Sequence, residues 1–108
     1  MTDKHILDQL YTVVVARKGA DPETSYTARL FAKGTAKIAQ KVGEEGVETV
    51  IAALAETPEK VASESADLLY HLTVLWADQG VKPEDVWNIL AERQGISGIA
   101  EKASRTDK

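Results

Sequence analysis

Apolar residues recur at intervals of three or four along most of the chain, a spacing that places them on one face of a helix. The apolar positions near the start of the chain are Ile6, Leu7, Leu10, Val13 and Val14. They predict an amphipathic helix over residues 4–18. A strand is an alternative for residues 11–15, because a tyrosine, a threonine and three valines follow one another there.

Capping residues predict where the other helices begin and end. Thr24 or Ser25 offers a side-chain oxygen to the first turn of a helix, and Thr57 followed by Pro58 is a start signal of the same kind. The predicted helices are residues 4–18, 26–33 and 35–55, a helix from Thr57 to Gly80 and another from Pro83 to Gly95, with a last turn over residues 99–104. These four or five helices predict an all-α helical bundle, and we expect a single domain over residues 1–108.

The composition narrows the class of protein. The 108 residues include thirteen Lys and Arg and seventeen Asp and Glu. The resulting net charge of −4 leaves no basic excess to cover nucleic-acid phosphates. The absence of cysteine excludes a disulfide scaffold, a zinc ribbon and a thiol nucleophile, and is compatible with the cytosol. The longest charge-free apolar stretch, residues 49–55, is far shorter than the roughly 20 residues that span a bilayer. Charges near the start argue against a signal peptide, so we expect a cytoplasmic protein without nucleic-acid or membrane partners.

Acidic residues gather on one face of each of the two longest predicted helices. The first set is Glu44, Glu45 and Glu48, and the second is Glu64 and Asp67, with His71 one turn further on. The connection around Thr57 is short, so the two helices are expected to pack antiparallel. Positions equally distant from the turn then lie level, which brings two acids of each helix face to face.

Crowded carboxylates repel one another unless a cation compensates their charge. Mg²⁺ or Mn²⁺ suits such oxygen ligands better than zinc does, because the chain has no cysteine and only two histidines. A magnesium ion that keeps bound waters can hold phosphates, and two such ions can clamp the attacking and leaving oxygens of a phosphoanhydride.

A solvated charged face is the alternative explanation for these acids. Against it, the second acidic set lies beside an apolar stripe on the helical wheel, made of Val61, Leu68, Leu72 and Leu75. Residues 49–55, one turn beyond the first set, contain no charge, which a solvated face would not explain. Gly43 and Gly46 also cost about 1 kcal/mol each inside a helix, relative to alanine. We therefore favour a metal site.

Four basic residues precede the acids at intervals of four, and they are Arg29, Lys33, Lys37 and Lys41. They are either ordinary exposed side chains or a cationic wall suited to a substrate with several phosphates. Gly34 lies among them, so they need not form one stripe. Two interpretations also remain for His71, as a partner of Asp67 or as a satisfied histidine at the core edge. Gly95 and Gly98 either end a helix or form a backbone nest for an anion.

The acidic pattern, Glu44-Glu45-x-x-Glu48 and, after fifteen residues, Glu64-x-x-Asp67, resembles the MazG-like superfamily of all-α nucleoside-triphosphate pyrophosphohydrolases. Longer strings resemble one family within it, the phosphoribosyl-ATP pyrophosphatases. These strings are Ser25-Tyr-Thr-Ala-Arg29, Lys33-Gly34, Ile38-Ala-Gln-Lys-Val-Gly-Glu-Glu45, Glu64-Ser-Ala-Asp-Leu-Leu-Tyr-His71, and Gly98 with Glu101-Lys-Ala-Ser-Arg105. The similarity extends from Leu7 to Arg105, and Gly46, where alanine is commoner, is a mild departure.

The resemblance implies the second step of histidine biosynthesis. In that step phosphoribosyl-ATP is hydrolysed with Mg²⁺ to phosphoribosyl-AMP and pyrophosphate, by in-line cleavage of the α–β phosphoanhydride in which a carboxylate takes the proton of water. The family's metal ligands, carried onto this chain, are Glu45, Glu48, Glu64 and Asp67. Glu44, which forms the catalytic set with Glu45 and Glu48, is expected to orient or deprotonate the water, or to hold another ion. The residues expected to bind substrate are Lys41, Lys37, Lys33, Arg29 and His71.

The resemblance and the small size also imply an obligate homodimer, with two helices from each subunit completing a four-helix core. Some relatives are fused to the cyclohydrolase of the next step, and we expect a stand-alone enzyme here. Two other functions stay open. A house-cleaning pyrophosphohydrolase of ordinary or deoxynucleoside triphosphates shares the acidic pattern. A non-catalytic helical interaction module would keep its function when Glu48 or Asp67 loses its charge.

Overall fold

The computed structural model describes residues 5–94, which form five helices and no strand. The helices are α1 (Ile6–Ala16), α2 (Tyr26–Lys33), α3 (Thr35–Ala55), α4 (Pro58–Gln79) and α5 (Pro83–Arg93). The all-α prediction is confirmed. None of these helices combines the length and the apolar character needed to cross a membrane. The last turn predicted over residues 99–104 and the alternatives for Gly95 and Gly98 lie outside the described residues.

Local side-chain chemistry accounts for the ends of the helices. Ser25, rather than Thr24, caps α2, and its hydroxyl accepts a hydrogen bond from the amide of Ala28 at 3.1 Å. Gly34, with a φ of 98°, separates α2 from α3, and Gly80, with a φ of 72°, ends α4. Residues other than glycine rarely adopt these backbone conformations, so both chain reversals depend on glycine.

The strand alternative for residues 11–15 is wrong, since all five belong to α1. Val14 is almost fully buried against α4, whereas Val13 and Val15 remain exposed. The helical spacing of Leu10 and Val14 lets both residues contact the same core. Tertiary packing therefore outweighs the local preference of consecutive valines for strands.

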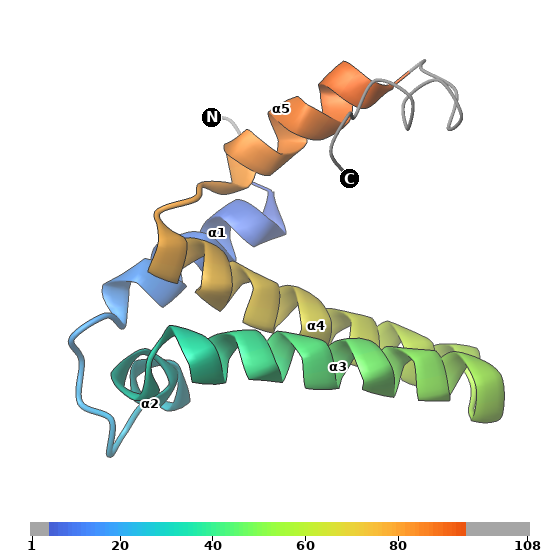
Figure 1. Cartoon of the computed structure of the whole chain (residues 1–108), viewed down its shortest axis with the longest axis horizontal. Coiled ribbons are helices and arrows are strands. Elements are labelled where there is room, and N and C mark those ends of the chain that lie inside the picture. The colour runs from blue at the N-terminus through green and yellow to red at the C-terminus, as the bar shows by residue number, and fades with distance from the viewer. Residues whose placement is uncertain (1–4, 95–108) are drawn as a thin grey trace.

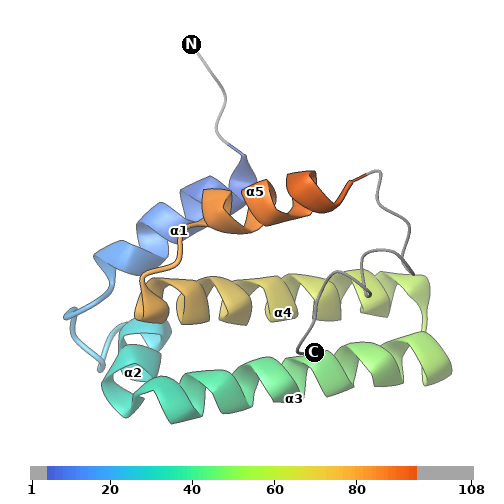
Figure 2. The same ribbon diagram turned by 45° about the horizontal axis from the view of Figure 1, so that its top comes forward.

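Helices α3 and α4 form a long antiparallel hairpin and share the most extensive packing in the described chain. The turn between them lies at the end of the hairpin remote from α2, and α2 crosses the start of α3 (Figure 1). Helices α1 and α5 lie on the α4 side of the hairpin (Figure 2). Among residues 5–94, the shorter helices consequently pack on the half of the hairpin remote from the turn and leave the half near the turn without a neighbouring helix.

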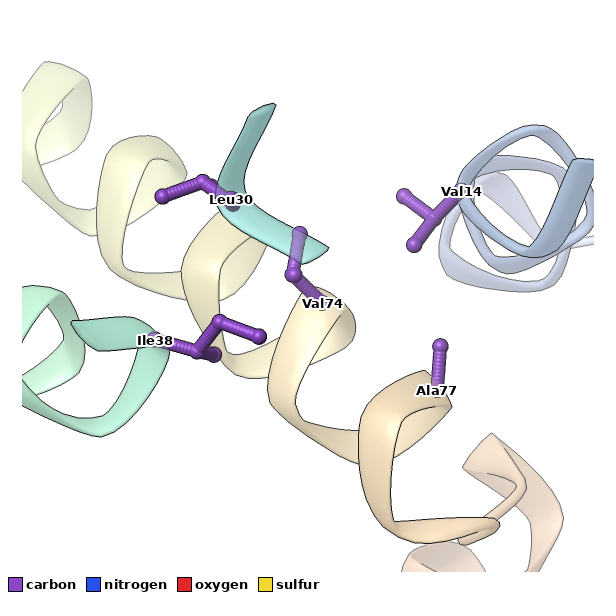
Figure 3. Packing of buried hydrophobic residues seen from close by; sticks show 5 residues of the cluster. All are labelled: Val14, Leu30, Ile38, Val74 and Ala77. Atoms are coloured by element: carbon purple, nitrogen blue, oxygen red, sulfur yellow. The ribbon is translucent and has the colours of Figure 1, made fainter. Parts of the chain in front are cut away.

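The core lies where α1, α2 and α3 meet the second half of α4. Val14, Leu30 and Ile38 come from three different helices and pack with Val74 and Ala77 of α4 (Figure 3). The apolar stripe expected on α4, made of Val61, Leu68, Leu72 and Leu75, is only half-buried. The buried face of α4 carries His71, Thr73, Val74 and Ala77 instead. The sequence pattern places apolar residues on a face but does not say which part of that face the other helices cover.

Candidate metal centre

Three acidic side chains meet across the α3–α4 hairpin. Glu45 and Glu48, one turn apart on α3, and Glu64 on α4 each place one carboxylate oxygen within 4.8 Å of the others. We call these three residues the acidic cluster. Their burial is graded, since Glu45 is buried, Glu64 is half-buried and Glu48 is exposed. The cluster therefore reaches from the interior of the hairpin to solvent, as a site for an exchangeable ligand requires.

Glu64 is the residue in the cluster with the least satisfied charge. Its Oε1 is buried and has no hydrogen-bond partner among residues 5–94, and its Oε2 lies 3.9 Å from the Lys60 ammonium. Burial, followed by the negative charge of Glu48, raises the pKa of Glu64 above its ordinary value of 4.5. A buried acceptor without a donor is costly, and a cation between the three carboxylates would satisfy it. The donor set of carboxylate oxygens fits a hard divalent ion.

The other two predicted acids lie beside the cluster. Asp67, one turn after Glu64 on α4, is exposed, and its charge adds to the repulsion at Glu64. Glu44 instead accepts hydrogen bonds from Gln40 at 2.7 Å and from Lys41 at 3.2 Å. These two contacts lower the pKa of Glu44 and keep it ionised. Of the five predicted acids, the structure thus brings Glu45, Glu48 and Glu64 closest together.

The four basic residues divide into two pairs at the break formed by Gly34. Lys37 and Lys41 lie on α3 before the acids, and both charges lower the pKa of Glu44, after the hydrogen bonds to that carboxylate. Arg29 and Lys33 are exposed on α2, and the Arg29 Nε donates to the Pro22 carbonyl at 3.2 Å. Of these four basic residues, Lys41 interacts with Glu45 of the acidic cluster and with Glu44 beside it, and Lys37 interacts with Glu44.

His71 is placed away from solvent, with an exposed fraction of 6%. Its Nδ1 lies 2.8 Å from the backbone carbonyl of Asp67, and its Nε2 lies 3.3 Å from the hydroxyl of Tyr26. Both interpretations of His71 therefore apply in part. The His71 ring contacts the backbone of Asp67, and both of its ring nitrogens have hydrogen-bond partners. The Asp67 carboxylate takes no part in this contact.

Sequence reasoning missed the tyrosines around His71. The Tyr26 and Tyr70 rings stack at 6.3 Å between centroids, and both meet the His71 ring edge to face. The hydroxyl of Tyr70 forms a short hydrogen bond with that of Thr27, and burial raises the pKa of Tyr70. Tyr26 and Thr27 belong to the string of residues 25–29 that resembles the family, and this resemblance could have marked them as candidate site residues. Their contacts with α4 span more than forty positions, which no local pattern reports.

A match to a known family shows where this chain belongs. Residues 7–94 match the family described as phosphoribosyl-ATP pyrophosphohydrolase. The chain belongs to this family. It is 69% identical over 100 residues to the phosphoribosyl-ATP pyrophosphatase of Azospirillum brasilense, with 93% of this chain and 90% of that protein covered. Identity to the protein of the same name from Paramagnetospirillum magneticum is 62% over 106 residues, covering 98% of this chain and 97% of the relative.

Proposed function

We propose that this protein hydrolyses the α–β phosphoanhydride of phosphoribosyl-ATP, giving phosphoribosyl-AMP and pyrophosphate, the second step of histidine biosynthesis. The observation that carries the proposal is the acidic cluster, because three convergent carboxylates with a buried, unpartnered oxygen suit a cation that binds phosphates. Membership of the family supplies the substrate. The same membership argues against a non-catalytic interaction module.

The cation we propose is Mg²⁺, with Mn²⁺ as a substitute, held by Glu45, Glu48 and Glu64. Asp67 lies one helical turn from Glu64 and is exposed, so its side chain is free to join them as the fourth ligand. When bound, such an ion neutralises phosphate oxygens and lowers the pKa of water. Zinc fits less well, since the site offers only carboxylates.

The chain's own residues divide the remaining work. Lys41 and Lys37 lie on α3 beside Glu44 and would bind the triphosphate, with Lys33 and Arg29 on α2 reaching its outer part. Glu44 is held ionised by its hydrogen bonds, and an ionised carboxylate can orient water and accept its proton. No covalent intermediate is needed, and we place the reaction in the cytoplasm.

We also propose that two copies of the chain associate through the α3 apolar face, which we define as Val47, Val50, Ile51 and Leu54. Their exposed fractions range from 49% to 83%, and their spacing places them on one side of the helix. A hollow beside this face is lined by Gln40, Gly43, Glu44, Val47 and Glu48, so the face is continuous with the acidic cluster. A second copy on this face would cover the apolar side chains and enclose the site.

The test is a panel of substrates, with and without EDTA, scored for pyrophosphate and phosphoribosyl-AMP. Phosphoribosyl-ATP should be hydrolysed much faster than ATP or deoxynucleoside triphosphates, and EDTA should stop the reaction. Glu48→Gln and Asp67→Asn should each reduce pyrophosphate release, whereas Glu92→Gln on α5 should not. A preference for deoxynucleoside triphosphates would assign a house-cleaning role instead, and full activity in both site variants would refute the proposed site.

A further inference from the structure

Tyr26 joins the start of α2 to α4 through a hydrogen bond whose direction follows from the tautomer of His71. The Asp67 carbonyl can only accept, so His71 Nδ1, at 2.8 Å from it, carries a hydrogen. In the neutral imidazole, Nε2 then has a lone pair and no hydrogen. The Tyr26 hydroxyl, 3.3 Å away, must therefore donate its only proton to His71. Its oxygen keeps lone pairs for other partners.

The Tyr26 ring is held firmly but remains accessible. Its exposed fraction is 45%, although it stacks on Tyr70 and meets the edge of His71. Tyr70 is tied in turn to Thr27, the next residue of α2, by a short hydrogen bond. Contacts from two helices thus fix both the position of Tyr26 and the direction of its O–H bond.

Tyr26 also lies beside the charged part of the site. The hydrogen bond to Glu44 is the main reason that the pKa of Lys41 is raised, and the proximity of Tyr26 and Glu45 raises it further. Lys41 is thus within electrostatic reach of Tyr26 and of Glu45 in the acidic cluster. The hydrogen bonds lead to the same part of the molecule, because His71, the partner of Tyr26, also contacts the backbone of Asp67, one helical turn after Glu64. Among the described residues, His71 is the one that hydrogen-bonds the Tyr26 hydroxyl.

We propose that Tyr26 accepts a hydrogen bond from a hydroxyl of the ribose next to the triphosphate, and that His71 is the positioning residue that turns Tyr26 into an acceptor. This inference rests on the proposed function, which places the triphosphate at Lys41. A phosphate oxygen is itself an acceptor and cannot pair with an oxygen whose proton is already donated. The nearest donors on a nucleotide, next to its phosphates, are the sugar hydroxyls. Tyr26 would therefore select ribonucleotides over deoxyribonucleotides.

The experiment compares kcat and KM for phosphoribosyl-ATP with those for its 2′-deoxy and 3′-deoxy counterparts on the adenosine ribose. The wild-type protein should prefer the ribo-substrate over one of the two by about tenfold in kcat/KM, as expected for one hydrogen bond. Tyr26→Phe should remove this preference by lowering kcat/KM for the ribo-substrate only. His71→Asn, which lacks an acceptor at the Nε2 position, should act in the same way, and His71→Gln should restore part of the preference.

Tyr11→Phe on α1 is the matched control, since it removes the hydroxyl of a tyrosine that takes no part in these contacts of Tyr26 and His71, and it should leave the preference intact. Circular dichroism melting identifies variants that fail to fold. The wild-type comparison needs no variant, and equal kcat/KM for all three substrates would refute the inference while leaving the proposed function standing. Retention of the preference in Tyr26→Phe would refute it equally. If the wild-type protein does not hydrolyse phosphoribosyl-ATP at all, the proposed function fails and the inference fails with it.

Discussion

Glu64 occupies the least favourable position among the acidic residues. Half-buried between Glu48 and Asp67, it has one oxygen without a donor and a pKa raised first by burial and then by the charge of Glu48. A purely structural residue at this position would be better as an uncharged side chain. This unfavourable placement of a carboxylate is expected at a site that binds a cation, because the ion relieves the repulsion between its ligands.

Replacing Glu64 should therefore separate stability from activity. Glu64→Gln should raise the melting temperature of the metal-free protein, since a charge that the fold disfavours is removed. Pyrophosphate release should fall by more than about 100-fold. Mutation of residues that only support metal ligands commonly lowers activity by up to about 100-fold, and Glu64 is itself a proposed ligand. Differential scanning calorimetry in EDTA and a pyrophosphate assay measure the two effects. Glu92→Gln on α5, as the control, should change neither.

The dependence of stability on pH follows from the direction of the same shift. The folded protein binds the Glu64 proton more tightly than the unfolded chain does, because the pKa of Glu64 is raised above 4.5. Stability of the metal-free protein should accordingly fall as pH rises from about 4.5 through the raised pKa. Urea unfolding across this range should show the decline in the wild-type protein and a smaller one in Glu64→Gln. Identical profiles would contradict the assignment.

Among the elements, the start of α3 and the end of α4 are joined by one polar contact. The Thr35 hydroxyl donates to the Asp78 carboxylate at 2.7 Å. This hydrogen bond is the main reason that the pKa of Asp78 lies below its ordinary value of 3.8, and Gln79 lowers it further. The contact closes the end of the hairpin opposite the turn, near the core around Ile38 and Val74.

Asp78→Asn should reduce the free energy of unfolding by about 1 kcal/mol, the value of one hydrogen bond to a charged group near the surface. Because the pKa of Asp78 is lowered in the folded protein, its contribution is present above pH 3.8 and is lost as pH falls through the lowered pKa. A double-mutant cycle with Thr35→Val checks the pair by urea unfolding at neutral pH. Fully additive losses would show that the two residues act independently.

Gly46 weakens α3, and no contact in the described part of the chain requires a glycine there. A Cβ added there would meet nothing within 4 Å. Gly46→Ala should therefore stabilise the protein by about 1 kcal/mol through helix propensity alone, and activity should be retained. Ala39→Gly, at an exposed position of the same helix, should change the free energy of unfolding by a similar amount in the opposite direction. Destabilisation by Gly46→Ala would indicate that another chain approaches this position.

The part of the molecule that the structure describes is open rather than compact. Its radius of gyration is 16.1 Å, compared with about 13 Å for a compact domain of about 100 residues. The turn end of the α3–α4 hairpin extends beyond the other helices (Figure 1). Leu54, the most exposed residue of the α3 apolar face at 83%, lies in the last turn of α3, next to this end. In the dimer proposed above, a second copy would cover this end and complete a four-helix core.

Leu54→Lys should therefore weaken association of two chains while leaving the single chain folded. Sedimentation velocity should show a species of twice the chain mass in the wild-type protein and a shift toward the single chain in the variant. Helicity by circular dichroism should be unchanged. Val13→Lys on α1 introduces the same charge at another exposed valine and should not alter the oligomeric state. A wild-type protein that sediments as a single chain would refute the proposed dimer.

The amino-acid sequence by itself determined the helices and the chemistry available to them. Helix ends could be predicted within about two residues, because capping depends only on residues close in sequence. The residues that mark these ends are Ser25, Gly34, Thr57 and Gly80. Carboxylates three and four residues apart share a helical face wherever that helix packs. Lack of cysteine and the oxygen-rich set of ligands likewise indicated a hard cation without knowledge of the fold.

Tertiary structure alone decided which of these residues meet. Glu44 and Glu45 are neighbours in sequence, but the rotation of α3 against α4 turns Glu45 toward the acidic cluster. Glu44 instead forms an ion pair with Lys41. Tyr26 and His71 are 45 positions apart, and only the crossing of α2 over the hairpin brings them into contact. The physical reason is that spacing along a helix fixes directions around its own axis. How one helix is rotated against the next depends on the packing of the core as a whole.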